Sequence, residues 1–67
     1  MIGVVVNGEA REVQEGASLR DLLDELAIGT RGVAVELNRE IVPKGSHDTT
    51  VLKEGDKVEV IQMVGGG

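Results

Sequence analysis

This short chain has to fold without disulfide bonds or cysteine-bound metal ions. Its 67 residues include no cysteine, so neither a disulfide nor a cysteine-ligated metal can support the fold. The length allows one small domain. An active site needs a concave pocket of roughly 300 Å³ or more with several converging polar groups, and so small a fold has little interior to spare for one. We therefore expect no catalytic residues and no enzyme acting alone.

The charge balance of the chain is acidic. It carries 12 Asp and Glu against 7 Lys and Arg, a net charge of −5, whereas a nucleic-acid backbone binds clustered basic residues. We expect no nucleic-acid partner, and a basic protein surface suits the charge better. The longest apolar run is far short of the ~20 residues that span a bilayer, and the start lacks the basic region of a signal peptide. These observations predict a cytoplasmic chain with no membrane partner, monomeric when free.

The dipeptide Asn7-Gly8 predicts a tight hairpin near the start of the chain. Asn-Gly favours the two-residue turn whose backbone twist matches that of paired strands. Apolar residues alternate before it at positions 2, 4 and 6, and the stretch 9–13 continues in extended form after it. We therefore expect a first β-hairpin over residues 2–13.

A helix is expected to begin at Leu19. Ser18 and Asp21 have the spacing of a capping box, in which the two residues satisfy free backbone N–H groups of the first turn. The apolar residues that follow form one stripe along a helix face, and they are Leu19, Leu22, Leu23 and Leu26. Gly29 is the expected residue just beyond the helix.

The rest of the chain is predicted to form short strands joined by polar turns. Three further strands are expected, over residues 33–37, 40–42 and 57–64, with a polar loop over 44–50. The prediction is a single α+β domain over residues 1–64, a β-grasp (ubiquitin-like) roll. Its mixed sheet has four to five strands, and one main helix packs across one face. A flexible glycine tail over residues 65–67 follows.

Alternation along the last strand predicts which of its side chains face solvent. Glu59 marks its own face as solvated, and Ile61 and Met63 share that face. Val5 lies on the outer face of the first strand by the same rule. If the two strands are neighbours, Val5, Ile61 and Met63 form an apolar patch for partner docking. Isolated exposed apolar residues are also normal on small proteins, so a patch without a function stays open.

Three consecutive glycines, Gly65, Gly66 and Gly67, end the sequence. Glycine loses the most entropy on ordering and has no side chain to bury, so these residues predict a flexible arm. A free α-carboxylate is an anion at neutral pH, and it resists nucleophiles until a phosphate or nucleotide group activates it. Glycines also thread a narrow channel in extended form. Taken alone, however, such a triplet is more often a frayed end.

Several segments along the chain match the pattern of one family. They are Val6-Asn7-Gly8, Gly16-Ala17-Ser18-Leu19, Leu22-Leu23 with Leu26, residues 35–43, residues 52–56 and residue 64 with the glycines. On these segments the chain resembles the ThiS family of sulfur carriers, ubiquitin-like β-grasp proteins that end in Gly-Gly. The most specific part combines residues 38–43, Gly55-Asp56 and Gly66-Gly67. His47 stands where members of the family often carry an aromatic residue.

The resemblance implies that Gly67 is the modified residue. In that family a ThiF-type adenylating enzyme uses ATP to activate the terminal carboxylate. A persulfide-type donor then supplies the sulfur of a thiocarboxylate, which is delivered to a ThiG-type thiazole synthase for the thiazole ring of thiamine. The chain itself is a co-substrate and carrier, with no bound cofactor. Gly66 is the second residue of the functional pair, and Gly65 extends the tail.

Other functions stay open on the sequence alone. The same terminal chemistry suits a carrier for molybdopterin or another sulfur acceptor, and it also suits a ubiquitin-like modifier that forms isopeptide bonds. A non-covalent β-grasp interaction module shares the Asn-x-x-Ile-Val-Pro pattern and needs no terminal glycines. His47 has Asp48 beside it but no further ligands at metal-binding spacing, so we expect a solvated loop residue and no metal site.

Overall fold

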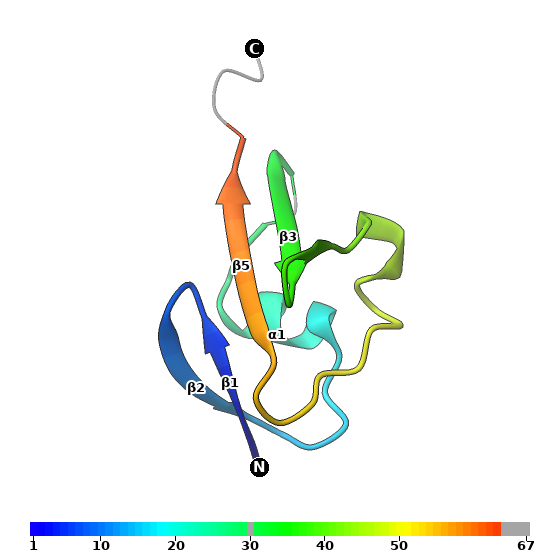
Figure 1. The fold of residues 1–67 in the computed structure, drawn as a ribbon. Coiled ribbons are helices and arrows are strands. Elements are labelled where there is room, and N and C mark those ends of the chain that lie inside the picture. The colour runs from blue at the N-terminus through cyan, green and yellow to red at the C-terminus, as the bar shows by residue number, and fades with distance from the viewer. Residues whose placement is uncertain (30, 64–67) are drawn as a thin grey trace.

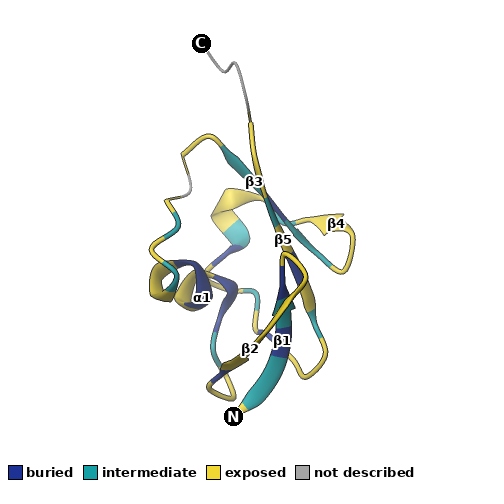
Figure 2. Ribbon diagram, turned by 90° about the vertical axis from the view of Figure 1, so that its left-hand side faces the viewer, coloured by how far each residue is buried: buried dark blue, intermediate teal, exposed yellow. Residues whose placement is uncertain are grey.

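A five-stranded sheet with a helix across one face makes up the structure of residues 1–29 and 31–63, the part that the computed structural model describes (Figures 1 and 2). Residue 64 of the expected last strand, the expected domain boundary after it and the expected tail Gly65, Gly66 and Gly67 lie outside the described residues. The elements are β1 (Ile2–Val6), β2 (Glu9–Val13), α1 (Leu19–Glu25), β3 (Val33–Leu37), β4 (Glu40–Ile41), the 3₁₀ turn η1 (Lys44–Ser46) and β5 (Lys57–Gln62).

The sheet is mixed, and its central strand is the last one in sequence. The strand order is β2-β1-β5-β3-β4. β1 and β5 run parallel, whereas the β1–β2, β3–β5 and β3–β4 pairs are antiparallel. This arrangement confirms the predicted α+β roll with one helix across a mixed sheet. β4 ends one residue earlier than expected, although Val42 N–H still donates to Val35 O at 2.9 Å.

The first hairpin forms as predicted. Asn7 and Gly8 have φ values of 49° and 83°, and a two-residue turn with positive φ at both positions has the twist that paired strands require. The register pairs Val6 with Glu9 and Ile2 with Val13. Asn7 adopts the left-handed conformation more readily than most residues because its short side chain hydrogen-bonds locally.

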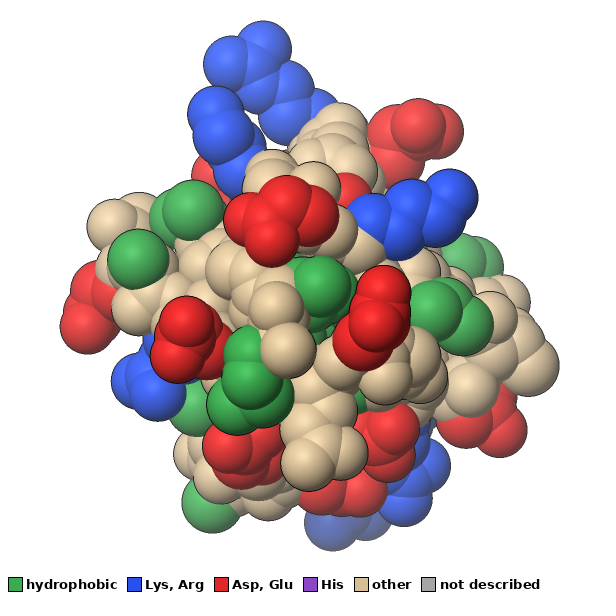
Figure 3. Space-filling view, turned by 90° about the horizontal axis from the view of Figure 1, so that it is seen from below, with side chains coloured by type: hydrophobic (Ala, Val, Ile, Leu, Met, Phe, Trp, Pro, Cys, Tyr) green, Lys and Arg blue, Asp and Glu red, His purple; other side chains and the backbone are tan. Residues whose placement is uncertain are grey.

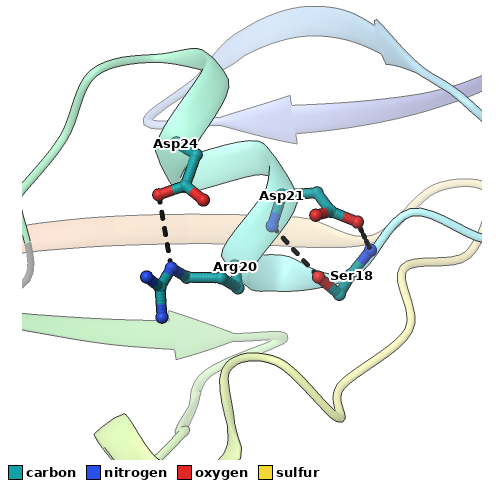
Figure 4. Close-up of polar contacts among 4 residues, drawn as sticks. All are labelled: Ser18, Arg20, Asp21 and Asp24. Atoms are coloured by element: carbon teal, nitrogen blue, oxygen red, sulfur yellow. Dashed lines mark hydrogen bonds and ion pairs between the residues drawn. The ribbon is translucent and has the colours of Figure 1, made fainter.

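The capping box at the start of α1 is present (Figure 4). Asp21 N–H donates to Ser18 Oγ at 3.0 Å, and Ser18 N–H donates to an Asp21 carboxylate oxygen at 3.0 Å. The helix therefore begins at Leu19, as predicted. Arg20 and Asp24 form an exposed ion pair on the outer side of the helix, which contributes little because water screens both groups.

The end of α1 differs from the prediction, which placed the terminating residue at Gly29. The helix ends at Glu25, and Ala27 takes the left-handed conformation with φ 58°. Ile28 N–H donates to Leu23 O at 2.9 Å, the long hydrogen bond of a Schellman motif. This earlier ending packs Ile28 against the core. Packing therefore sets the end of the helix, and an alanine occupies the position that glycine usually fills.

The core lies between α1 and the inner face of the sheet, as the dark blue segments of Figure 2 show. It contains three of the four leucines predicted for the helix, inward-facing valines of the strands, and Leu52 from the segment before β5. The fourth leucine, Leu26, is the C-cap residue and is only partly buried against this core. The buried members of the core are Val4, Val6, Val13, Leu19, Leu22, Leu23, Val35, Leu52 and Val58. Aliphatic packing against the helix therefore fixes which face of each central strand points inward.

The loop that follows β4 is more ordered than predicted. It contains the 3₁₀ turn Lys44–Ser46, and the prediction of a solvated His47 is wrong because this side chain is only 4% exposed. Its Nε2 lies 3.1 Å from Val42 O, while Nδ1 has no partner among the described residues. The backbone carbonyl of His47 accepts Arg20 N–H at 2.9 Å. The loop thus supplies acceptors to the first turn of α1, and His47 is buried as a result.

The left-handed alanine yields a test of the helix end. Ala27→Gly removes the Cβ that crowds the carbonyl in this conformation, and glycine adopts it without strain. We expect the free energy of unfolding to rise by about 0.5–1 kcal/mol. Urea unfolding followed by circular dichroism at the helix band measures this, since the chain has no Trp or Tyr for fluorescence.

A matched control is available in β2. Ala10 lies in that strand and has no positive φ, so Ala10→Gly should lower stability through the greater chain entropy of glycine in the unfolded state. If Ala27→Gly also lowers stability, Ala27 does not terminate the helix in a left-handed conformation.

Candidate functional site

The predicted reactive tail follows β5 in the sequence, so the end of β5 is the nearest described part of the chain. β5 ends at Gln62, and Met63 N–H donates to Gly32 O at 2.8 Å, which extends the pairing by one residue. Met63 is the last described residue, and it is 63% exposed. The predicted modified residue Gly67 and its neighbours Gly65 and Gly66 lie beyond it, outside the described residues.

The predicted docking residues share one face of the sheet but do not adjoin one another. β1 and β5 are neighbours, as the patch requires, and Val5 lies opposite Lys57. Ile61 is four residues further along β5, about 13 Å away at the rise of an extended strand. Glu59 lies on the same face between them. Val5 is therefore separate from Ile61 and Met63, and the docking role of all three stays a prediction.

A further exposed apolar residue, Ile41, was missed by the sequence analysis. It is 67% exposed and pairs with Glu36, which in turn pairs with Glu59. Paired residues share a face, so Ile41 lies on the same open side of the sheet as Ile61, which is 41% exposed. The Asn38-Arg39 turn, which fixes the register of β4 against β3, was the signal that could have placed it.

The acidic balance of the chain is visible on its surface. Figure 3, seen from the end where β1 begins, shows Asp and Glu side chains scattered among hydrophobic ones. A surface hollow of about 480 Å³ beside β2 and α1 is lined in part by Glu12, Asp21 and Glu25. In residues 1–29 and 31–63, no group of three potential ligands is placed to hold a metal ion. Nor is any described helix long and apolar enough to cross a membrane.

The most specific stretch of the resemblance joins β5 to the β3–β4 turn. Asn38 Oδ1 accepts Lys57 N–H at 3.0 Å, and Asn38 Nδ2 donates to Asp56 Oδ1 at 3.1 Å. Asp56 also accepts Lys53 N–H at 2.8 Å through its other oxygen. Gly55, with φ 85°, makes the turn between them possible. These residues therefore fix the position of the start of β5, at the opposite end of that strand from Gln62.

Comparison with known proteins gives a family match over nearly the whole chain. The ThiS family model matches residues 4–67. The sulfur carrier protein ThiS of Thermus thermophilus is 39% identical over 96% of this chain and 98% of its own length. A thiazole synthase of Paramagnetospirillum magneticum is 44% identical over 96% of this chain, but the chain spans only 20% of that protein's length.

A solved structure supports the same fold. The crystal structure of the thiamine biosynthesis protein ThiS from Geobacter metallireducens superposes with a TM-score of 0.85 at 35% sequence identity. The match covers 98% of this chain and 100% of that one. The β-grasp architecture of this chain is therefore shared with a ThiS protein.

The Asn38 contacts predict a loss of stability when that side chain is truncated. Asn38→Ala removes two hydrogen bonds and leaves a residue with φ 52° that alanine tolerates poorly. We expect the free energy of unfolding to fall by about 2 kcal/mol, measured by urea denaturation.

Arg39 provides a control in the same turn. It has φ 71°, and Arg39→Gly relieves that conformation while keeping the Asn38 contacts. Stability should change by no more than about 0.5 kcal/mol or should rise. Equal losses from the two changes would show that the turn itself, rather than the Asn38 side chain, seats β5.

Proposed function

The chain belongs to the ThiS family, and we propose on that basis that it is a sulfur carrier for thiamine biosynthesis. The observation that carries the proposal is a family match that runs from residue 4 through Gly67. A named sulfur carrier of nearly equal length also matches 96% of the chain. The reacting group is the α-carboxylate of Gly67. The protein is a co-substrate of other enzymes and does not catalyse the reaction.

The carboxylate has to be activated before it can accept sulfur. As an anion it repels nucleophiles, so we propose that a ThiF-type enzyme directs a carboxylate oxygen onto the α-phosphate of ATP and releases pyrophosphate. The terminal sulfur of a persulfide then attacks the carbonyl carbon, and AMP leaves. A thiol of the donor breaks the resulting S–S bond, forming a disulfide and releasing the thiocarboxylate. We propose that these steps take place in the cytoplasm, where ATP is available.

The sulfur acceptor in this proposal is a thiazole synthase. Support comes from relatives with that name, in which a segment similar to this chain occupies about a fifth of the length. Domains that are joined in one chain in some organisms often bind each other where they occur as separate proteins. The open face that bears Ile61 and Met63 lies beside the end of β5, so we propose that it faces the partner while the tail reaches the reaction centre. We propose that Val5, which is separate from Ile61 and Met63 on the same face, makes a second contact with the partner.

An intact-mass measurement tests the proposal. The protein is isolated from its native host, or it is incubated with an adenylating enzyme, a persulfide donor and ATP. Replacing one oxygen by sulfur should add about 16 Da, and the added mass should disappear when Gly67 is deleted. This result requires Gly67 to bear the free carboxylate of the mature protein.

Gly45 offers a matched control within the described part of the chain. A Cβ added there meets nothing within 4 Å, so Gly45→Ala should gain the sulfur normally. An unchanged mass of the unaltered protein under full supply contradicts the sulfur-carrier proposal. Adducts of much higher mass would instead indicate a modifier that is joined to other proteins.

A further inference from the structure

The central strand β5 is flanked on both sides for only the first part of its length. β1 pairs with it at Lys57 and Val58, whereas β3 pairs with it as far as Gln62. Figure 1 shows β5 continuing beyond the tip of the β1–β2 hairpin, with β3 on one side and no strand on the side of β1. The last part of β5 therefore has an open, unpaired edge on the side of β1, although β5 is the central strand of the sheet. The glycine tail continues in sequence from this part of the strand.

The hydrogen bonds show which backbone groups point to this open edge. Asn7 N–H donates to Val58 O at 2.9 Å, and Asn7 Oδ1 accepts Val60 N–H at 2.8 Å. The odd-numbered residues of β5 point their backbone groups the other way, and Met63 N–H accordingly donates to Gly32 O on the β3 side. Since the N–H and C=O of one residue in a strand point the same way, those of Gln62 point to the open edge. Within residues 1–29 and 31–63, neither group of Gln62 has a backbone partner.

An open edge of this kind matches an extended peptide. Its free N–H and C=O groups have the spacing that an added strand satisfies, and side chains in alternate pockets supply specificity. Proteins usually protect such edges with charged residues, proline or a bulge. Residues 60–63, Val-Ile-Gln-Met, contain no charged residue and no proline. The edge is therefore unprotected at the position closest to the tail.

A hollow lies beside the open edge. It has a volume of about 610 Å³, and its lining includes Ile28, Arg31, Val33 and Val60. Because successive side chains of a strand point to opposite faces, an added strand would place every second side chain on this side of the sheet. The aliphatic lining favours an apolar side chain, and the exposed Arg31 favours a neighbouring carboxylate. The hollow thus favours an added strand that has an apolar side chain facing it and an acidic residue nearby.

We infer that an extended segment of the thiazole synthase pairs with Gln62 along this edge when sulfur is delivered. The inference rests on the proposed function. Gly65, Gly66 and Gly67 offer a partner no side chains, so only their backbone can be recognised. A partner strand that pairs with Gln62 fixes the register of β5, the strand from which these glycines continue in sequence.

The test removes one backbone donor and compares binding to the thiazole synthase of the same organism. Gln62→Pro deletes the N–H that faces the open edge, and a strand tolerates proline where the N–H makes no internal bond. Gln62→Ala keeps the N–H and changes only the side chain. Because the Gln62 side chain also lines the hollow, Gln62→Ala serves as the reference variant. We expect Gln62→Pro to bind with a Kd about tenfold higher than that reference, both measured by calorimetry with the intact enzyme.

A synthetic variant covers the case in which proline distorts β5. The 67-residue chain is within reach of chemical synthesis, and an ester in place of the amide before Gln62 removes the same N–H while leaving the backbone angles free. Amide exchange by NMR then reports on the edge directly. The Gln62 amide should exchange quickly in the free chain and slowly in the complex, whereas the Met63 amide should be protected in both.

The outcomes separate this inference from the proposed function. If the unaltered chain does not bind the thiazole synthase, both are wrong. If it binds, but the ester binds equally well and the Gln62 amide gains no protection, the edge inference alone is wrong. A tenfold weaker ester together with new protection of Gln62 supports the pairing.

Discussion

The pairing of β5 with both β1 and β3 is the interaction on which the rest of the sheet depends. β1 with β2 and β3 with β4 are two hairpins, and β5 is the strand that joins them. Its Val58 is buried beneath α1 as part of the one core. Because β5 is also the last strand, the element that completes the fold leads directly into the predicted reactive residues. β5 is therefore anchored in the core at Val58, and its exposed end at Ile61 and Gln62 is held by pairing with β3.

Two asparagines hold β5 in place from opposite sides. Asn7 and Asn38 each stand first in a two-residue turn and have positive φ. Their side-chain oxygens accept the N–H groups of Val60 and Lys57, respectively. A short amide side chain tolerates the left-handed backbone and also offers a carbonyl that substitutes for a strand partner. In the described part of the chain, no such contact continues beyond Val60 on the β1 side, so the open edge begins there.

The sequence predicted the features that depend on neighbouring residues and missed those that depend on distant ones. Ser18 begins a helix by contacts within one turn, so its spacing was sufficient. Ala27 terminates that helix because the next residue packs on the core, and nothing in alanine itself signals this. His47 is buried because its loop satisfies the helix N-terminus. The separation of Val5 from Ile61 follows from the register of two strands some 50 residues apart in the sequence, and alternation fixes the face of a residue but not its register.

The open edge also suits a carrier that binds its acceptor without being tethered to it. A domain tethered to its enzyme meets it at about millimolar effective concentration, so weak contacts suffice. A free chain obtains its affinity from its own surface, and a large apolar patch would also drive it to associate with itself. The exposed Ile41, Ile61 and Met63 are interrupted by Glu36 and Glu59, which limits such a patch. Within residues 1–29 and 31–63, the backbone groups of Gln62 at this edge add register and affinity for a partner strand without enlarging the apolar surface.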